Sequence, residues 1–359
     1  MSLHFEKIPV KKIQEETNEC VTITLDIPGS LKPAFAFTHG QHLNFRSIIN
    51  GEELRRTYSL CTAPYEKEWK VAVKKTYNGR FSTFVNEQLK VGDILEVMPP
   101  SGTFSTPIDP AQRKNYVAFA AGSGITPIIS ILKTILQEEP LSTFTLVFGN
   151  KTRQSIIFFE ELEGLKNKYL NRFQLIFLLS REKTESPIND GRISFEKLKS
   201  LEKLIQYNRV HEYFICGPET MLFCVKEFLQ SIGVAEKKIH FELFTTPGEN
   251  IVQTLPIKKP EAIGASSSIS VKIDGRFTQF EMAEDDPHSI LDAALHAGAD
   301  LPFSCKGGVC CTCKAKLLEG EVDMKVHYGL EDEEIEEGFI LTCQSRPLTK
   351  NVVVDFDIK

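Results

Sequence analysis

The feature of this sequence that most constrains its fold is a group of cysteines near the C-terminus. Four residues separate Cys305 from Cys310, two separate Cys310 from Cys313, and Cys343 follows at a distance. Plant-type [2Fe-2S] clusters are held by four cysteines with this spacing. Two adjacent glycines between the first two cysteines allow the loop to wrap closely, so that backbone N–H groups can face the sulfur atoms. We therefore predict a [2Fe-2S] cluster with these four cysteines as its ligands.

A fifth cysteine, Cys311, is surplus to this set, and we interpret it as a thiol that points away from the cluster. A structural zinc site is the alternative, because zinc also uses Cys-x-x-Cys pairs, although usually at more even spacing. The chain has nine cysteines, an odd number, and its first residues lack the basic start and apolar core of a signal peptide. We therefore expect a cytoplasmic protein without a disulfide framework.

Charge is distributed unevenly along the chain. Residues 269–359 carry 9 Lys and Arg against 18 Asp and Glu, whereas residues 1–268 carry 33 against 30. Pro, Gly and Ser are frequent between residues 245 and 268, a composition typical of a linker. We therefore predict an acidic C-terminal domain, residues 269–359, that is joined to the rest of the chain by a linker, residues 245–268.

The same counts argue against two classes of partner. The formal net charge of the whole chain is -6, so no excess of positive charge is available to neutralise a phosphate backbone. The longest uncharged stretch, residues 116–132, is interrupted by Gly and Pro and is better explained as strand, loop and helix than as a membrane span. We expect neither a nucleic acid nor a membrane as a partner.

The hydrophobic pattern divides residues 1–244 into two regions. Residues 1–108 alternate apolar and polar side chains in short runs between turn residues, which predicts an antiparallel barrel or sandwich. Residues 109–244 alternate apolar strands with helical periods, which predicts a doubly wound parallel α/β sheet. The predicted strands are residues 21–25, 42–45, 56–60, 69–73, 94–97, 116–120, 144–148, 173–179 and 213–215, and the predicted helices are residues 128–137, 158–168, 195–204 and 220–232.

A predicted strand turns into a helix through small residues at Gly122-Ser-Gly124-Ile-Thr126. Backbone N–H groups at the start of such a helix can bind a pyrophosphate. A Gly-x-Gly loop alone often forms only a tight turn, but this one opens the α/β region, where an open parallel sheet binds nucleotides. The loop therefore predicts a dinucleotide site.

Two motifs in the first region offer further groups to a cofactor. Arg56-Thr-Tyr58-Ser59 places a guanidinium, an aromatic ring and a hydroxyl on one short strand. Gly79-Arg-Phe-Ser82-Thr83 is a second loop that leads into a helix and could receive a phosphate. The alternative interpretation of the first motif is a surface charge and a ring in the barrel wall.

A fourth motif, Cys216-Gly-Pro-Glu219, follows the apolar strand 213–215. The carboxyl end of a parallel strand is where α/β sheets bind ligands. The alternative is that Cys216 is only a small buried hydrophobe, as single cysteines often are.

With these four motifs in this order, the chain resembles the ferredoxin–NADP⁺ reductase superfamily, in the branch that carries a plant-type ferredoxin domain at its C-terminus. The strings that begin at Tyr116, Phe148, Phe214 and Ile239 are similar to those of reductase subunits of multicomponent phenylacetyl-CoA epoxidases. The resemblance implies an FAD-binding β-barrel at residues 1–108, an NADPH-binding α/β domain at residues 109–244 and a ferredoxin domain of β-grasp type, an α+β fold, at residues 269–359.

The resemblance also implies roles for individual residues. Arg56 would bind the FAD pyrophosphate, Tyr58 would lie against the flavin, and Ser59 would lie near its reactive nitrogen. Cys216 would stand beside the nicotinamide carbon that gives up hydride, and Glu242 would close over the flavin. The implied catalytic residues are thus Cys216, Ser59 and Glu242, and the implied cofactor-binding residues are Arg56, Thr57, Tyr58, Ser59, Lys74, Gly79, Ser82, Thr83, Gly122, Gly124, Thr126, Thr152, Ser180, Arg181, Gly217 and Phe244.

Ser180-Arg181 follows the predicted strand 173–179, at the place where NADPH-specific relatives bind the ribose 2′-phosphate. A permanently charged, planar guanidinium suits a phosphate dianion, whereas an NADH enzyme would favour a carboxylate there. The alternative is a surface arginine that pairs with Glu182 or with nothing. We therefore predict NADPH as the electron donor, with FAD as the converter between two-electron chemistry and the one-electron cluster.

The resemblance implies an oxygenase as electron acceptor, namely the di-iron phenylacetyl-CoA epoxidase of phenylacetate degradation. Another di-iron monooxygenase or a Rieske dioxygenase is an alternative acceptor, and a non-catalytic zinc-binding interaction protein is an alternative of a different class. The acidic run 331–337 would make the ferredoxin domain strongly negative. Because charge complementarity raises the encounter rate of a weak contact, we expect a basic rim on the acceptor.

Overall fold

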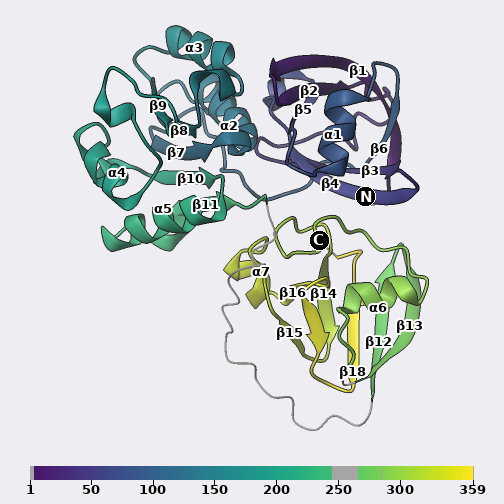
Figure 1. Ribbon diagram of the computed structural model, residues 1–359. Coiled ribbons are helices and arrows are strands. Elements are labelled where there is room, and N and C mark those ends of the chain that lie inside the picture. Colours follow the sequence, from purple (N-terminus) through teal and green to yellow (C-terminus); the bar gives the residue numbers. More distant parts are fainter. Residues whose placement is uncertain (1–3, 245–265, 284, 359) are drawn as a thin grey trace. The chain divides into compact units, whose positions relative to one another are not determined.

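The structure, a computed structural model, describes residues 4–244, 266–283 and 285–358. The chain divides into two compact units, Phe5–Phe244 and the C-terminal region (Figure 1). Most of the predicted linker lies outside the described residues, but the first strand of the C-terminal unit begins at Ser266, three residues before the predicted boundary. Among the described helices, none combines the length and the apolar character needed to cross a membrane.

The first half of the unit Phe5–Phe244, named the N-terminal barrel, is a six-stranded antiparallel sheet in the order β4-β3-β6-β1-β2-β5. A bridge between Leu60 and Val71 joins the chain after β4 to β5 and so connects the two edges of the sheet. The predicted antiparallel barrel is therefore confirmed. Its elements are β1 (Glu6–Thr17), β2 (Cys20–Leu25), β3 (His42–Ile49), β4 (Glu52–Ser59), β5 (Trp69–Lys74), α1 (Arg80–Glu87) and β6 (Ile94–Val97).

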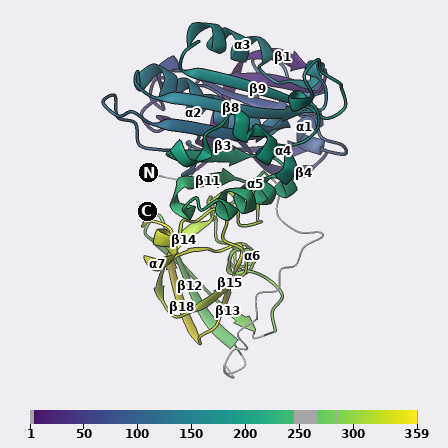
Figure 2. The same ribbon diagram turned by 90° about the vertical axis from the view of Figure 1, so that its left-hand side faces the viewer.

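The second half, named the parallel-sheet domain, has five parallel strands in the order β11-β10-β7-β8-β9. Figure 2 shows β8 and β9 side by side in front of the barrel. The strand order reverses between β7 and β10, so the carboxyl ends of these two strands form the topological switch point, where such sheets bind nucleotides. The elements are β7 (Asn115–Ala121), α2 (Ile125–Glu138), β8 (Thr143–Asn150), α3 (Phe159–Lys168), β9 (Phe173–Leu179), α4 (Phe195–Ser200), β10 (Glu212–Cys216), α5 (Glu219–Ser231) and β11 (Ile239–Glu242).

Helix α2 is the element that joins the two halves. Residues Ile125–Leu136 are all buried, because α2 lies between the parallel sheet and the N-terminal barrel (Figure 1). Its first turn follows the glycine-rich loop directly. Any shift of α2 relative to the barrel would therefore move the predicted nucleotide loop.

The C-terminal unit is a mixed five-stranded sheet in the order β13-β12-β18-β14-β16, with β12 and β18 parallel and the other pairs antiparallel. Helix α6 buries Ile290, Leu291 and Ala294 in the core of this unit. The predicted α+β fold is confirmed. The elements are β12 (Ser266–Ile273), β13 (Arg276–Ala283), α6 (Ile290–His296), β14 (Lys314–Glu319), β15 (Val322–Met324), α7 (Asp332–Glu336), β16 (Phe339–Leu341), β17 (Ser345–Pro347) and β18 (Asn351–Asp355).

Candidate functional site

Two loops cross closely at the topological switch point. Gly122 has a φ of 54°, in the left-handed region, and the turn Gly122–Gly124 leads into α2. A Cβ atom at Gly124 would lie 2.1 Å from the carbonyl oxygen of Cys216, and one at Gly217 would lie 2.7 Å from Cε of Met221. Glycine is therefore required at position 124, where the loop after β7 meets the backbone of the loop after β10. Because the first turn of α2 has no side-chain cap, its backbone N–H groups suit an anion such as a pyrophosphate.

The end of β4 meets the end of β11 through a hydrogen bond. The buried hydroxyl of Ser59 donates to Oε2 of Glu242 at 2.9 Å, and Glu242 lies opposite Cys216 in the register of β11 and β10. The other oxygen of Glu242 lies 3.7 Å from Nδ1 of His42, whose Nε2 is 3.2 Å from Oγ of Ser101. The structure thus brings the three predicted catalytic residues together from three separate strands.

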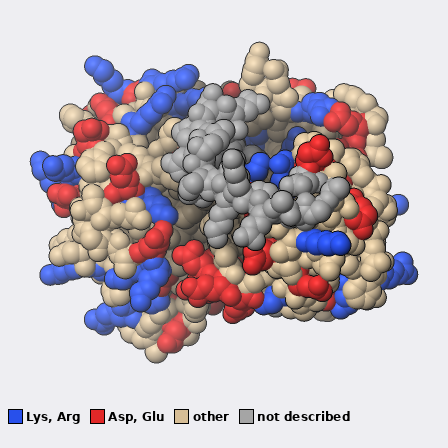
Figure 3. Space-filling view, turned by 90° about the horizontal axis from the view of Figure 1, so that it is seen from below, with Lys and Arg blue, Asp and Glu red and all other residues tan. Residues whose placement is uncertain are grey.

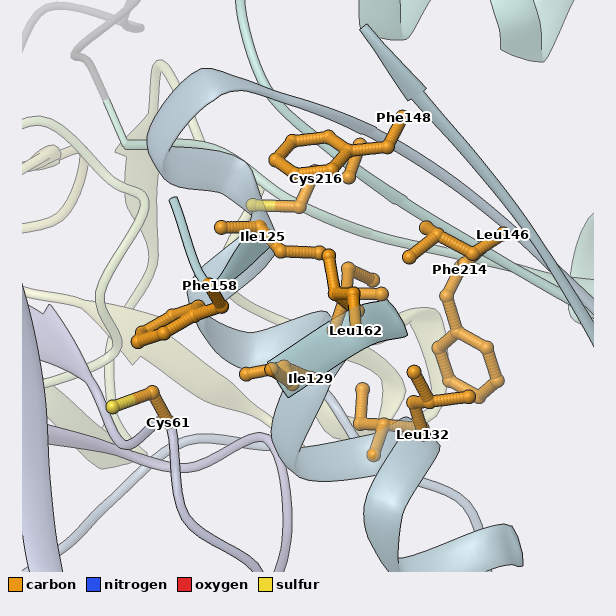
Figure 4. Close-up of a cluster of buried hydrophobic side chains, with 14 of the residues drawn as sticks. Cys61, Ile125, Ile129, Leu132, Leu146, Phe148, Phe158, Leu162, Phe214 and Cys216 are labelled. Atoms are coloured by element: carbon orange, nitrogen blue, oxygen red, sulfur yellow. The ribbon is translucent and has the colours of Figure 1, made fainter. Parts of the chain in front are cut away.

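Cys216 is fully buried in the core of the parallel-sheet domain. Figure 4 shows its sulfur beside Ile125, with the ring of Phe148 on the other side. Burial, and secondly the negative charge of Glu242, raise the pKa of this thiol well above its ordinary value. Cys216 therefore remains a neutral thiol at physiological pH, which suits an apolar wall rather than a nucleophile.

The predicted flavin strand exposes a cation next to an aromatic surface. Arg56 is exposed, and its guanidinium donates to the carbonyl oxygen of Arg55 at 2.7 Å. The half-buried ring of Tyr58 stacks on Phe81 at a centroid distance of 5.8 Å and meets Phe45 edge-on at 5.9 Å. The hydroxyl of Thr57 is directed elsewhere and contacts the amide oxygen of Asn44. Arg56 and Tyr58 thus offer a phosphate ligand and a flat apolar surface on the same strand.

The second predicted phosphate loop closes tightly on itself. A Cβ atom at Gly79, the N-cap of α1, would lie 2.1 Å from Oγ1 of Thr76 and 2.4 Å from Oγ of Ser82. The buried Ser82 hydroxyl accepts from the N–H of Thr76 and donates to the carbonyl of Gly79, so it orders the turn. Thr83 lines a cavity of about 240 Å³ together with Gly79 and Arg80. The cavity lies at the N-terminus of α1, where no side chain caps the backbone N–H groups. These N–H groups can therefore bind a phosphate group.

The ends of β8 and β9 form a basic edge. The N–H of Ser180 donates to the carbonyl of Asn150, and the N–H of Arg181 donates to that of Lys151, so the two strand ends continue side by side. Arg181 is exposed and makes no ion pair within the described residues. The carboxylate of Glu182 instead accepts from the backbone N–H of Arg153 at 2.8 Å. The guanidinium of Arg181 is therefore available to an anionic ligand.

The remaining predicted residues lie at the margins of these sites. Thr152 caps a short turn after β8, and the Thr126 hydroxyl donates to the carbonyl of Ser123 at 3.0 Å. Lys74, at the end of β5, is 4.0 Å from a carboxylate oxygen of Glu19. Phe244 lies two residues after the end of β11 and is 41 % exposed, which leaves its ring open to a ligand.

The four predicted cluster ligands lie in two contacting pairs. The thiols of Cys305 and Cys310 form one hydrogen-bonded pair, and those of Cys313 and Cys343 form the other. Each iron of a [2Fe-2S] cluster takes two cysteines, so this pairing matches the donor set that such a cluster needs.

The loop around these cysteines is ordered by backbone groups. The thiol of Cys310 and the N–H groups of Gly307, Val309 and Cys310 lower the pKa of the Cys305 thiol below its ordinary value. Gly308 has a φ of 75°, and a Cβ atom there would lie 2.6 Å from the carbonyl oxygen of Val326. Cys311 also has a positive φ, and its thiol donates to the carbonyl of Gly329. The surplus cysteine is therefore directed toward a neighbouring loop.

Sequence reasoning missed three residues that the structure places in these sites. His42 lies close to the carboxylate of Glu242 but reads only as a strand residue in the sequence. Arg192 is exposed beside the end of β9, because the chain returns there through a bridge between Leu179 and Asp190. Gln344 donates from its amide to the carbonyl of Lys306, which ties the two cysteine-bearing segments together. Of these three residues, only Gln344 could have been identified from the sequence, because it lies next to the predicted ligand Cys343.

Three domain families match the chain in the order of its three domains. Residues 7–106 match an oxidoreductase FAD-binding domain, residues 119–227 an oxidoreductase NAD-binding domain and residues 271–348 a 2Fe-2S iron-sulfur cluster binding domain. The chain is 44 % identical to a component protein of the 1,2-phenylacetyl-CoA epoxidase of Escherichia coli (strain K12), over 99 % of this chain and 98 % of that protein.

The chain belongs to the ferredoxin–NADP⁺ reductase-like proteins that carry a C-terminal [2Fe-2S] ferredoxin domain. This reductase is also 32 % identical to the ferredoxin reductase component of 3-ketosteroid-9-alpha-monooxygenase of Rhodococcus rhodochrous, over 97 % of this chain and 96 % of that protein. The solved structure of phthalate dioxygenase reductase aligns with a TM-score of 0.59 at 25 % identity and covers 98 % of both chains. The protein is therefore an NAD(P)H-dependent flavin oxidoreductase, the electron-transfer component of an oxygenase.

Proposed function

We propose that this reductase takes electrons from NADPH and delivers them to a multicomponent oxygenase that acts on phenylacetyl-CoA. FAD would be held by Arg56, Tyr58 and the α1 loop, and the [2Fe-2S] cluster would be held by the four cysteines of the two contacting pairs. The observation that carries the proposal is the hydrogen bond between Ser59 and Glu242. This hydrogen bond brings the end of β4, the predicted flavin strand, to the switch point next to Cys216. A dinucleotide bound at the switch point would therefore lie against the flavin.

Bound flavin supplies the conversion between hydride transfer and single-electron transfer, which neither nicotinamide nor an iron–sulfur cluster can make alone. The chain supplies a path for a proton. Ser59 is hydrogen-bonded to Glu242, and Nδ1 of His42 lies 3.7 Å from the other carboxylate oxygen, so three groups that can each give or accept a proton lie next to one another. Because Ser59 is buried, a proton at its Oγ would pass to the carboxylate of Glu242 without first entering bulk water.

Selection of NADPH over NADH would depend on the basic edge of the parallel sheet. Arg181 and Arg192 are both exposed at the end of β9, and Arg181 has no carboxylate partner there within the described residues. Two guanidinium groups match the charge of a 2′-phosphate and can donate to it in pairs. A hydroxyl at the same position, as in NADH, offers neither the charge nor the acceptor oxygens.

The identity of the acceptor is supported by the full-length similarity to the epoxidase component of E. coli. A second candidate is an aromatic-ring dioxygenase, because the structure of phthalate dioxygenase reductase matches the whole chain as well. The two candidates differ in the oxygenase component that receives the electron and not in the reductase chemistry.

Reconstitution with purified oxygenase components tests the proposal. NADPH oxidation and product formation would be measured with the phenylacetyl-CoA epoxidase oxygenase components and phenylacetyl-CoA, and in parallel with phthalate dioxygenase and phthalate. We expect coupled turnover, with one product formed per NADPH oxidised, only in the first mixture. Faster coupled turnover with the dioxygenase, or equal rates with NADH and NADPH, would contradict the proposal.

A further inference from the structure

Lys133 is a buried cation in the helix that joins the two halves of the unit Phe5–Phe244. Its side chain is only 4 % exposed, and its Nζ lies 2.8 Å from Oε2 of Glu66 and 2.9 Å from Oε1 of Glu161. Glu161 is on α3 of the same domain, whereas Glu66 ends the short 3-10 turn Pro64–Glu66 of the N-terminal barrel. Lys133 therefore makes one ion pair within its own domain and one across the boundary.

The ion pair across the boundary connects the two segments that form the hydride site. Lys133 belongs to α2, which begins directly after the glycine-rich turn of the predicted nucleotide loop, and Glu66 follows Ser59 by seven residues. Oε2 of Glu66 also accepts from the N–H of Ala63 at 2.5 Å, which fixes the carboxylate on its own turn. Both partners of the ion pair across the boundary are therefore held in place, Lys133 by Glu161 and Glu66 by its own turn.

A second contact lies on the same side of α2. The hydroxyl of Ser130, three residues before Lys133, donates to the carbonyl oxygen of Thr62 at 2.6 Å. Residues three apart on a helix are neighbours on its surface. The two contacts therefore hold one face of α2 on the segment 62–66, immediately after the strand that carries Arg56, Tyr58 and Ser59.

Stability alone does not explain a lysine at this position. Burial of an ion pair carries a desolvation cost that can exceed its electrostatic gain, and well-packed apolar side chains of similar volume are often as stable. An apolar contact, however, would allow α2 to slide along the barrel, whereas two short, charged hydrogen bonds define both distance and direction. The ion pair is thus suited to fix a position.

We propose that the ion pair between Lys133 and Glu66 positions the nucleotide-binding helix against the flavin-binding segment and thereby sets the alignment for hydride transfer. Lys133 is a positioning residue, because it contacts two carboxylates and acts on the reaction only through α2. The proposal rests on the proposed function, which assigns the flavin to the strand that ends at Ser59. Misplacement by about 1 Å can slow a reaction by roughly 10²-fold, so a small shift of α2 would be measurable.

Four single variants of the full chain separate positioning from stability. Glu66→Gln and Lys133→Met break the contact across the boundary, and Glu66→Gln keeps the volume of the side chain. Glu161→Gln breaks only the pair within the parallel-sheet domain. Lys114→Met is the matched control, since Lys114 pairs with Glu212 inside the same domain.

The measurements are the limiting rate of flavin reduction by NADPH in stopped-flow, the apparent Kd for NADPH, and the long-wavelength charge-transfer absorbance between nicotinamide and flavin. We expect Glu66→Gln and Lys133→Met to lower the limiting rate by about tenfold or more and to weaken this absorbance, with Kd changed by less than about threefold. Glu161→Gln and Lys114→Met should remain within about twofold of the wild type, because neither disturbs the boundary contact.

Two results would overturn the positioning role. One is an equal loss of rate in Glu161→Gln, which would indicate a general loosening of the helix. The other is an unchanged limiting rate in Glu66→Gln. The wild type distinguishes this failure from failure of the proposed function: absence of flavin reduction by NADPH in the wild type overturns both, whereas normal reduction in the wild type and in all variants overturns the positioning role alone.

Discussion

The two proposed redox sites of this reductase are built in different ways. The proposed hydride site is assembled across the boundary between two domains: the hydrogen bond between Ser59 and Glu242 joins residues 183 positions apart in the chain. The cluster site is local, since Cys305, Cys310 and Cys313 lie within nine residues of one loop of the C-terminal unit. A hydride moves only between atoms almost in contact, which requires a rigid arrangement of both domains. A cluster requires only that this loop and the segment that carries Cys343 be correctly formed, and both belong to one compact unit.

This difference predicts two patterns of failure. Damage to a cluster ligand should remove one electron-transfer function and leave the other intact, because the two sites belong to separate compact units. A substitution in the proposed hydride site should slow flavin reduction by an amount that depends on how far the changed residue lies from the reacting atoms. Four predictions, each with a control variant, test these patterns.

The largest effect is expected for Cys305→Ser. Loss of one thiolate ligand should abolish cluster binding and electron delivery to the oxygenase, because a serine hydroxyl is not deprotonated at neutral pH as the thiol is. NADPH-driven reduction of small dyes, which can take electrons directly from flavin, should survive. Iron content, the visible spectrum and dye reduction would be measured on the same preparation.

Cys311→Ser is the matched control for this prediction. Its thiol is directed to the carbonyl of Gly329, so the variant should retain the cluster and its spectrum. If Cys311→Ser loses the cluster and Cys305→Ser retains it, then Cys311, and not Cys305, is a ligand of the cluster. Loss of dye reduction in a folded Cys305→Ser protein that still holds FAD would show that the cluster lies on the only path for electrons.

The next effect concerns recognition at the end of β9. Arg181→Ala should raise KM for NADPH by roughly ten- to a hundredfold and leave KM for NADH nearly unchanged, because a lost hydrogen bond to a charged group costs about 1.5–3 kcal/mol. Arg113→Ala is the control, since it removes an exposed arginine just before β7, at the opposite end of that strand from the nucleotide loop. Equal losses with both nucleotides would indicate a structural role for Arg181.

The sequence predicted most elements of the parallel-sheet domain because buried parallel strands and amphipathic helices leave strong patterns. Strand β1 was not predicted. Only Ile8 and Val10 of β1 are buried, and the register against β2 shifts between Val10 and Lys12 and again between Glu15 and Thr17. Each shift moves the side chains to the other face of the strand, so the alternation that marks a strand is lost.

Prediction of the candidate sites from the sequence was also limited to local patterns. Spacing alone predicted the four cysteines, because most ligands of such a cluster lie on one loop and are close in the sequence. Ser59 was identified from its motif as a hydroxyl on the flavin strand, but its catalytic role and Glu242 entered only through the family resemblance, since no local pattern links strands so far apart. His42 and Lys133 were not predicted at all. Both are ordinary residues in the sequence and gain their roles from a partner on another domain.

A smaller effect is expected for Cys216→Ala. If Cys216 forms the wall beside the nicotinamide, the variant should slow flavin reduction by roughly tenfold, as expected for a small misplacement of a bound reactant, without loss of FAD. Removal of the buried sulfur should also cost about 1 kcal/mol of folding stability through the cavity it leaves. Stopped-flow reduction and thermal unfolding would be measured together.

Cys61→Ala separates these two contributions. Cys61 is a buried cysteine of the same core cluster, contributed by the N-terminal barrel (Figure 4). Its removal should cost similar stability and leave the rate of flavin reduction unchanged. If both variants slow the reaction equally, Cys216 acts only as a buried hydrophobe, which was the alternative interpretation of its motif.

The smallest effect is expected on the surface of the C-terminal unit. Acidic side chains gather in part of the face shown in Figure 3, and α7 exposes Glu333 and Glu336, followed by Glu337. Glu334 differs from these three, because it pairs with Lys314 at 2.8 Å and accepts from the N–H of Glu331. A test of electrostatic steering must therefore spare Glu334, whose loss would damage the start of α7.

The variant with Glu333, Glu336 and Glu337 changed to Gln should lower the second-order rate of electron transfer to the native oxygenase by a few-fold at low salt, in the manner of long-range steering. The deficit should shrink at physiological ionic strength, where fields are screened over about 8 Å. Glu281→Gln, which changes an exposed residue on β13 at the other edge of the sheet, should have no effect. Reduction of small neutral dyes should not change in either variant, because it needs no oriented encounter. A rate equal to that of the wild type at low salt would mean that the acidic run is only a solvated surface and that the oxygenase docks elsewhere on the cluster unit.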